Sequence, residues 1–142
     1  MARSAFVASR WALAVVFLGA AACDSPTGPP TSSRVAPGPW GGDRILLTVT
    51  DSGAALRQFC AQGTIDRPLM LDSSGRFDAA GSYMRQRGGP AREGDIHPAR
   101  FTGSTDGMTL TLTVTQTDDG QVFGPFSMRF GSVVDVGPCP LV

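Results

Sequence analysis

The stretch "MTLTLTVTQT", Met108 to Thr117, has the clearest pattern in this chain of 142 residues. Apolar residues alternate in it with threonines; the apolar ones are Met108, Leu110, Leu112 and Val114. Successive side chains of a strand point to opposite faces, so alternation with period two is typical of a strand with one buried and one wet face. The stretch therefore predicts a β-strand that borders a hydrophobic core.

The same alternation recurs in five other stretches. They are "RILLTVT" (44–50), "LRQFC" (56–60), "RFDAAGSYMR" (76–85), "HPARFTGS" (97–104) and "FGPFSMRF" (123–130). Between them, acidic or hydroxyl residues lead to a glycine, which is a hairpin signal. These turns are "DSG" at Asp51, "DSSG" at Asp72, "STDG" at Ser104 and "TDDG" at Asp118. The chain after residue 40 shows no helical period and reads as an all-β meander.

A meander of seven or eight antiparallel strands must protect its two edge strands from pairing with other chains. The simplest solution is to close into a small up-and-down β-barrel. A sandwich of two sheets is the alternative, because similar strand spacing suits it as well.

The tripeptide "GPW", Gly38 to Trp40, resembles the Gly-x-Trp of the first strand in lipocalin-like and avidin-like barrels. In that resemblance Trp40 plugs one end of the barrel, and Arg129 from the last strand covers it. The alternative is that Trp40 simply anchors the first strand. The resemblance implies a cup for a small apolar or amphipathic ligand. Its interior would be lined by Trp40, Phe77, Tyr83, Phe101, Leu110, Leu112 and Phe126.

The first 22 residues have the layout of a secretory signal, with Arg3 and Arg10 before an apolar run that is too short to span a bilayer. Cys23 follows three alanines and resembles the lipobox cysteine of bacterial lipoproteins. Residues 23–39 are rich in Pro, Ser and Gly and predict an extended linker, which leaves 40–142 for the barrel domain. We expect a lipid-anchored protein of the cell envelope that faces the periplasm or the exterior; plain secretion with a free thiol is the alternative.

The chain has three cysteines, an odd number for an exported protein. Lipidation of Cys23 would leave Cys60 and Cys139 as an even pair, and in an oxidising compartment a disulfide is the expected state. A redox or metal role is the alternative. No C-x-x-C spacing supports it, and these two cysteines with the single histidine, His97, are too few ligands for a zinc site.

Charge is balanced, with 12 arginines, no lysine and 12 carboxylates, and a mature chain without its leader would be slightly acidic. Nucleic-acid binding requires a clustered positive surface, so we expect no nucleic-acid partner.

The segment from Arg85 to Arg100 is the longest irregular one, and such loops often carry function. In it His97 lies near Glu93 and Asp95, which suggests a metal or acid–base site, although a solvated, charge-mixed loop has the same composition. Its arginines suggest a cradle for an anion; they are Arg85, Arg87, Arg92 and Arg100.

Motifs for a nucleophile, a phosphate loop or a metal are missing from the sequence. We therefore expect no enzymatic activity, no cofactor and no metal. Two functions remain as hypotheses: a non-enzymatic binding module for a small apolar or amphipathic ligand, and a structural or inhibitor-like module that binds an envelope protein.

Overall fold

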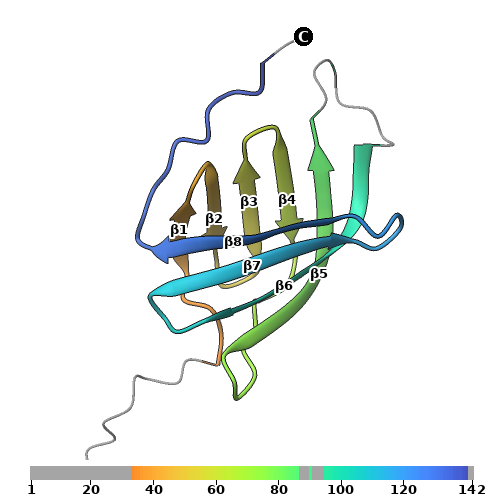
Figure 1. The fold of residues 1–142 in the computed structure, drawn as a ribbon. Helices are drawn as coiled ribbons and strands as arrows, with labels where there is room; N and C mark the ends of the chain where they lie inside the picture. Colours follow the sequence, from red (N-terminus) through yellow and green to blue (C-terminus); the bar gives the residue numbers. More distant parts are fainter. Residues whose placement is uncertain (1–32, 87–89, 91–94, 141–142) are drawn as a thin grey trace, which may run out of the picture.

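Eight antiparallel strands form a closed barrel in the computed structural model, which describes residues 33–86, 90 and 95–140 (Figure 1). The strands are β1 (Gly38–Gly42), β2 (Ile45–Val49), β3 (Ala54–Gln58), β4 (Ala61–Ile65), β5 (Arg76–Arg85), β6 (Ile96–Thr105), β7 (Thr109–Gln116) and β8 (Val122–Phe130). Each pairs with the next in the chain, and β1 pairs with β8 to close the ring. The predicted all-β barrel is thus confirmed, and the alternative of a sandwich is wrong.

Strand β7 shows how the alternating pattern builds the core. Leu110, Leu112 and Val114 point into the barrel and are completely buried, whereas the threonines between them stay half-buried on the other face. Met108, expected on the buried face, lies instead in the β6–β7 turn with an exposed fraction of 67%. The strand begins one residue later than the pattern because Asp106 turns the chain by accepting hydrogen bonds from the backbone N–H groups of residues 108 and 109.

Aromatic rings fill the places where the strands carry glycine. A Cβ atom added to Gly63 or to Gly81 would lie 2.9 Å from the ring of Phe101, and one added to Gly103 would lie 2.7 Å from the ring of Phe77. Only glycine leaves room for a ring at these positions. The Phe101 ring of β6 therefore packs over the glycines of β4 and β5, and the Phe77 ring of β5 packs over the glycine of β6. Strand β4, "AQGTI", was not among the alternating stretches, because two of its three inward residues, Ala61 and Gly63, are small, and Phe101 occupies the space at Gly63.

The alternating direction of the strands gives the barrel two distinct ends. One end, here called the N-terminal end, holds the start of β1 and the β2–β3, β4–β5 and β6–β7 turns. The other, here called the disulfide end, holds the β1–β2, β3–β4 and β7–β8 turns. The described chain begins at the first of these ends (Figure 1).

The N-terminal end is closed by a segment that the sequence assigned to the linker. Val35 and Leu69 are each 1% exposed, and the Val35 N–H donates to the carbonyl of Leu69 at 2.9 Å. The expected linker of residues 23–39 is therefore too long, since residues from Ser33 onward pack on the domain. The signal segment, Cys23 and the rest of the linker lie outside the described residues. Within the described part of the chain, no helix has the length and apolar character needed to cross a membrane.

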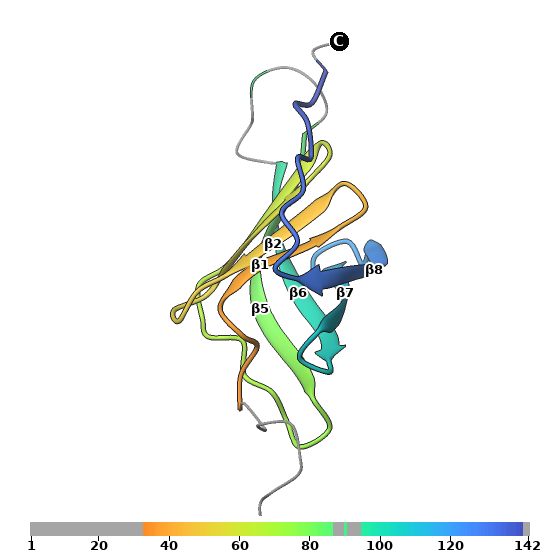
Figure 2. The same cartoon turned by 90° about the vertical axis from the view of Figure 1, so that its left-hand side faces the viewer.

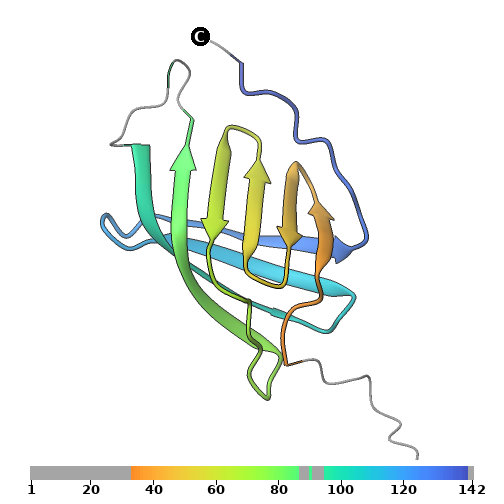
Figure 3. The same cartoon turned by 180° about the vertical axis from the view of Figure 1, so that it is seen from behind.

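The C-terminal segment 131–140, here called the strap, runs from the end of β8 back along the outside of the barrel to the disulfide end (Figures 2 and 3). It passes over β1 at Gly41, where an added Cβ would lie 2.5 Å from the Ser132 carbonyl oxygen. The strap ends in the predicted disulfide between Cys60, in the β3–β4 turn, and Cys139. That pairing is confirmed, and it joins segments separated by 79 residues.

Candidate functional sites

Most of the predicted ligand-binding interior is densely packed. Trp40, Tyr83, Phe101, Leu110 and Leu112 are 0–1% exposed, and Phe77 is 4% exposed. A void large enough for a water molecule would leave accessible area on the side chains around it, so the completely buried ones border no such void. These six residues belong to one continuous hydrophobic core.

The tryptophan of the Gly-x-Trp motif is buried, but not in the expected way. The Trp40 Nε1–H donates to the carbonyl of Ala36 at 3.0 Å, and the ring meets that of Phe130 edge-on, with 5.0 Å between centroids. Arg129 was expected to cover Trp40, and that prediction is wrong. Its side chain is exposed, because Met128 points inward and alternation turns the next residue outward.

Phe126, the seventh predicted interior residue, is only half-buried and lies at a hollow in the mouth of the disulfide end. This mouth hollow has a volume of about 520 Å³ and is lined on its apolar side by Ile45, Phe59, Pro125 and Phe126. The Arg44 guanidinium stands 4.9 Å above the centroid of the Phe59 ring.

Below this end, Tyr83 donates from its hydroxyl to Gln58 Oε1 at 3.0 Å. Burial of the Tyr83 ring raises the pKa of its hydroxyl, despite the lowering effect of the Arg85 charge. Tyr83 therefore stays a neutral hydrogen-bond donor. Its ring belongs to the hydrophobic core, and its hydroxyl forms a polar contact with Gln58.

The predicted arginine cradle is not assembled among the described residues. Arg85 stacks on Phe123, with its guanidinium carbon 5.3 Å from the ring centroid. Arg100 lies flat against Asp78 on the outer face, with Nε and Nη2 donating to the two carboxylate oxygens at 2.7 and 2.8 Å. Arg87 and Arg92 lie outside the described residues. The two described arginines thus face different partners, so the cradle is not supported.

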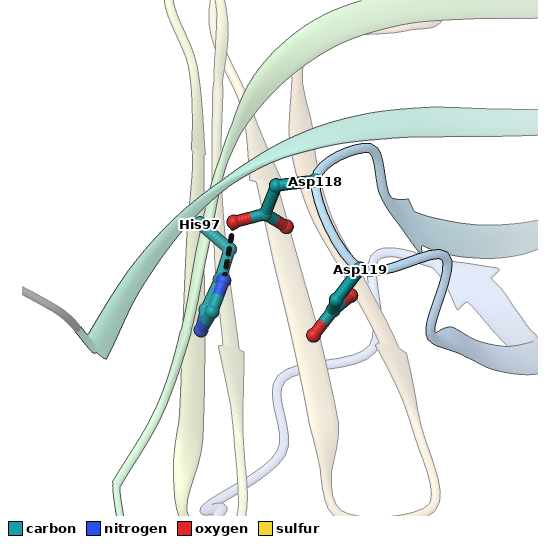
Figure 4. Close-up of side chains that lie close together, drawn as sticks. All are labelled: His97, Asp118 and Asp119. Atoms are coloured by element: carbon teal, nitrogen blue, oxygen red, sulfur yellow. Dashed lines mark hydrogen bonds and ion pairs between the residues drawn. The ribbon is translucent and has the colours of Figure 1, made fainter.

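His97 comes close to two carboxylates that the sequence did not indicate as its partners. Its Nδ1 forms a hydrogen bond of 2.7 Å with Asp118 Oδ2, in the β7–β8 turn (Figure 4). Asp119, next along that turn, brings a third ligand atom, and the three ligand atoms lie within 4.8 Å of one another. Of the predicted neighbours, Glu93 lies outside the described residues. We call these three residues the His97 cluster.

The antiparallel register explains why these residues meet. Ala99 pairs with Gln116 in the β6–β7 hairpin. His97 lies two residues before Ala99 and Asp118 two residues after Gln116, so the same register places them opposite each other. Backbone pairing between the two strands continues past the first of these pairs, since the Thr117 N–H donates to the Pro98 carbonyl at 2.9 Å. His97 was singled out from the sequence, whereas its two partners were read only as turn residues. Applying the hairpin register to the sequence would have revealed them.

Hydrogen bonds contact both carboxylates of the cluster. The hydrogen bond from His97 lowers the pKa of Asp118, so this carboxylate is ionised at neutral pH. The neighbouring Gln116 is 2% exposed and places its amide nitrogen 3.1 and 3.2 Å from the two carboxylate oxygens of Asp119, in the amide orientation that satisfies both groups. The cluster thus holds two carboxylates and one imidazole beside a buried amide.

Two other carboxylates make the fold sensitive to acid. Asp72 accepts backbone hydrogen bonds from Arg76 and Ser74, and Asp106 accepts them from Thr109 and Met108; these bonds lower the pKa of both side chains. A lowered native pKa gives stabilisation that is complete above the unfolded value and lost as the pH falls through the native value. We therefore expect the urea midpoint of unfolding to fall below about pH 4.

Replacing both residues, by Asp72→Asn and Asp106→Asn, should reduce this loss between pH 4 and pH 2. The remaining loss comes from Asp78 and Asp118, whose pKa values are lowered by hydrogen bonds from Arg100 and His97. Asp66→Asn, an exposed residue in the β4–β5 loop, is the control and should leave the profile unchanged. A midpoint that stays constant from pH 7 to pH 2 in the unmodified protein would contradict the assignment.

No protein-family model, curated protein or solved structure matches this chain. The likeness of "GPW" to lipocalin-like and avidin-like barrels thus remains a resemblance in one tripeptide and in the order of the strands.

Proposed function

We propose that this protein is a non-enzymatic binding module of the bacterial cell envelope, anchored through a lipid on Cys23. We further propose that it contacts an envelope protein through the disulfide end of its barrel. The observation that carries the second part is the packed interior, whose largest side chains are 0–1% exposed. A barrel without interior space offers a partner only its outer surface and its mouths.

Position favours the disulfide end as the binding surface, whereas large apolar side chains are exposed at both ends, with Met70 and Met108 exposed by 56% and 67% at the N-terminal end. A tether attached before Ser33 meets the barrel at the opposite, N-terminal end, so the disulfide end would project away from the membrane. Three large apolar side chains are exposed at the disulfide end: Phe59 by 38%, Ile96 by 56% and Val122 by 61%. Exposed apolar side chains around a mouth hollow are typical of an interaction surface.

Export is supported by the disulfide between Cys60 and Cys139, since such bonds persist mainly in oxidising compartments. The anchor rests on the sequence around Cys23. Two acyl chains at that cysteine would hold the protein stably on a membrane, because each buried methylene contributes about 0.8 kcal/mol.

A non-enzymatic role is supported by the surroundings of the chain's single histidine. Within the described residues, the side chain that shares a hydrogen bond with His97 is Asp118, and no serine, threonine or cysteine side chain joins the pair. A general base needs a nucleophile or a substrate proton within such reach.

The experiment has two arms in the native host. Intact-mass analysis of the processed protein should show an acylated N-terminus at Cys23 and a deficit of two hydrogens from the disulfide. A photo-crosslinking residue at Val122 or Phe59 should give a discrete product with one envelope protein, and the same residue at Met108, at the N-terminal end, should not. An unmodified Cys23 would refute the anchor, and equal products from both ends would refute the binding surface.

The mouth hollow favours a second candidate, the binding of a small amphipathic ligand. Its apolar wall and the Arg44 guanidinium would suit a molecule with an apolar body and an anionic head. A fluorescent single-chain fatty acid is a suitable probe. Saturable binding that Phe126→Asp abolishes, and that Met108→Asp leaves intact, would establish this candidate over the first. If the fatty acid shows no saturable binding, this candidate is refuted and the protein partner remains the proposed occupant of the mouth hollow.

A further inference from the structure

We propose that the His97 cluster binds one divalent transition-metal ion, of the class of Zn²⁺, and that the ion joins the start of β6 to the β7–β8 turn. The sequence suggested Glu93 and Asp95 as partners of His97, whereas Asp118 and Asp119 lie in the turn that follows the next strand. The proposal is independent of the lipid anchor and of the binding surface proposed above.

The geometry is close to what a zinc ion requires. Zinc binds histidine nitrogen and carboxylate oxygen at about 2.0–2.2 Å, so ligand atoms around it lie roughly 3.3 Å apart. In the His97 cluster the ligand atoms span 2.7 Å between His97 Nδ1 and Asp118 Oδ2, and all lie within 4.8 Å. Both aspartates are exposed and lie in a turn, so small side-chain rotations bring the three groups to zinc distance.

Charge favours a cation at this point. Two adjacent carboxylates face one imidazole, and among the described residues no arginine forms an ion pair with Asp118 or Asp119. The ion would replace the proton between His97 Nδ1 and Asp118, which passes to solvent. Two carboxylates and a neutral imidazole then balance the double positive charge of the metal.

The surroundings of the cluster hold its ligands in place. The buried Gln116 amide contacts both oxygens of Asp119, which limits the positions that this carboxylate can take. The Thr117 N–H bond to the Pro98 carbonyl holds the turn against the residue that follows His97. Such supporting hydrogen bonds orient metal ligands in known sites.

The type of ion follows from the ligand set. One imidazole nitrogen with carboxylate oxygens suits zinc and similar borderline ions, whereas calcium and magnesium prefer sites made entirely of oxygen. We therefore expect the cluster to bind Zn²⁺ in preference to Mg²⁺ or Ca²⁺. The three side chains leave further coordination positions for water.

The test uses the purified, disulfide-bonded full chain without an affinity tag, carrying Cys23→Ser so that its third thiol supplies no ligand. Titration calorimetry with ZnCl₂ should show one Zn²⁺ per chain. Because the chain has a single histidine, the imidazole ¹⁵N signals report on His97 alone, and they should shift on saturation. Asp119→Asn should weaken Zn²⁺ binding at least tenfold, and His97→Gln should abolish it.

The controls separate binding from folding. His97→Gln retains a side chain that can donate to Asp118, and its far-ultraviolet circular dichroism should match that of the parent chain. Asp106→Asn, in a turn at the N-terminal end, should leave Zn²⁺ binding unchanged. The proposal is overturned if no saturable binding of Zn²⁺ occurs, if the His97 signals do not move, or if folded His97→Gln binds Zn²⁺ as the parent chain does.

Discussion

Replacement of Cys139 by serine is expected to lower the free energy of unfolding by about 4–5 kcal/mol, because a cross-link over a loop of this length restricts the unfolded chain strongly. The bridge to Cys60 closes a loop across 79 positions of the sequence. It also fastens the strap, which contacts Gly41 on the outside of β1. Urea unfolding followed by tryptophan fluorescence measures this loss.

Two further variants make that result specific. Cys60→Ser combined with Cys139→Ser should be no less stable than Cys139→Ser alone, since both lack the same bond. Cys23→Ser should unfold at the same urea concentration as the parent chain, because it leaves the bridge intact. A loss below 1 kcal/mol for Cys139→Ser would show that the strap contributes little to the fold.

Replacement of Phe101 by alanine should cost about 3–5 kcal/mol of stability, as the loss of a fully buried aromatic side chain usually does. The ring of Phe101 is completely buried and fills the space above Gly63 and Gly81. Neither glycine can move inward to close the cavity without breaking its strand pairing. Thermal and urea unfolding, with native circular dichroism as the check on folding, measure the effect.

A double-mutant cycle tests whether ring and glycine fit each other. Gly63→Ala alone should destabilise, because its Cβ would lie 2.9 Å from the ring of Phe101. In the Phe101→Ala background that clash is gone, so the added methyl group should cost less or stabilise. Phe59→Ala, at the exposed β3–β4 turn, is the matched control and should cost less than 1 kcal/mol. Additive effects of Gly63→Ala and Phe101→Ala would contradict this packing.

Alternation was enough to predict strands such as β5, in which the large inward residues Phe77 and Tyr83 flank small ones. The stretch Arg76 to Arg85 matches β5 residue for residue, and "RILLTVT" contains β2. The pattern fails where the core requires small residues, as on β4, because the volume there is supplied by Phe101 from another strand. A single strand's sequence does not show which ring will lie above its glycines.

The site was harder to predict for a related reason. His97 was singled out from the sequence as a candidate site residue, and its sequence neighbours were taken for its partners. In an antiparallel hairpin the residues that meet are those at equal distance from the turn, so His97 faces Asp118 across β6 and β7. Similarly, Arg100 was predicted to contribute to an anion cradle, but the pairing of β5 with β6 places Asp78 beside it.

The position of the disulfide divides the chain into two parts that would respond differently to mechanical load. The bridge from Cys60 to Cys139 encloses β4 to β8 in one covalent loop, whereas β1, β2 and β3 lie outside it. A pulling force applied through the N-terminus reaches β1 first and can peel these three strands away. It then acts on the bridge, so extension would stop at Cys60 with the remaining strands still enclosed. In the oxidised state, tension on the N-terminus can thus lengthen only the chain that precedes Cys60.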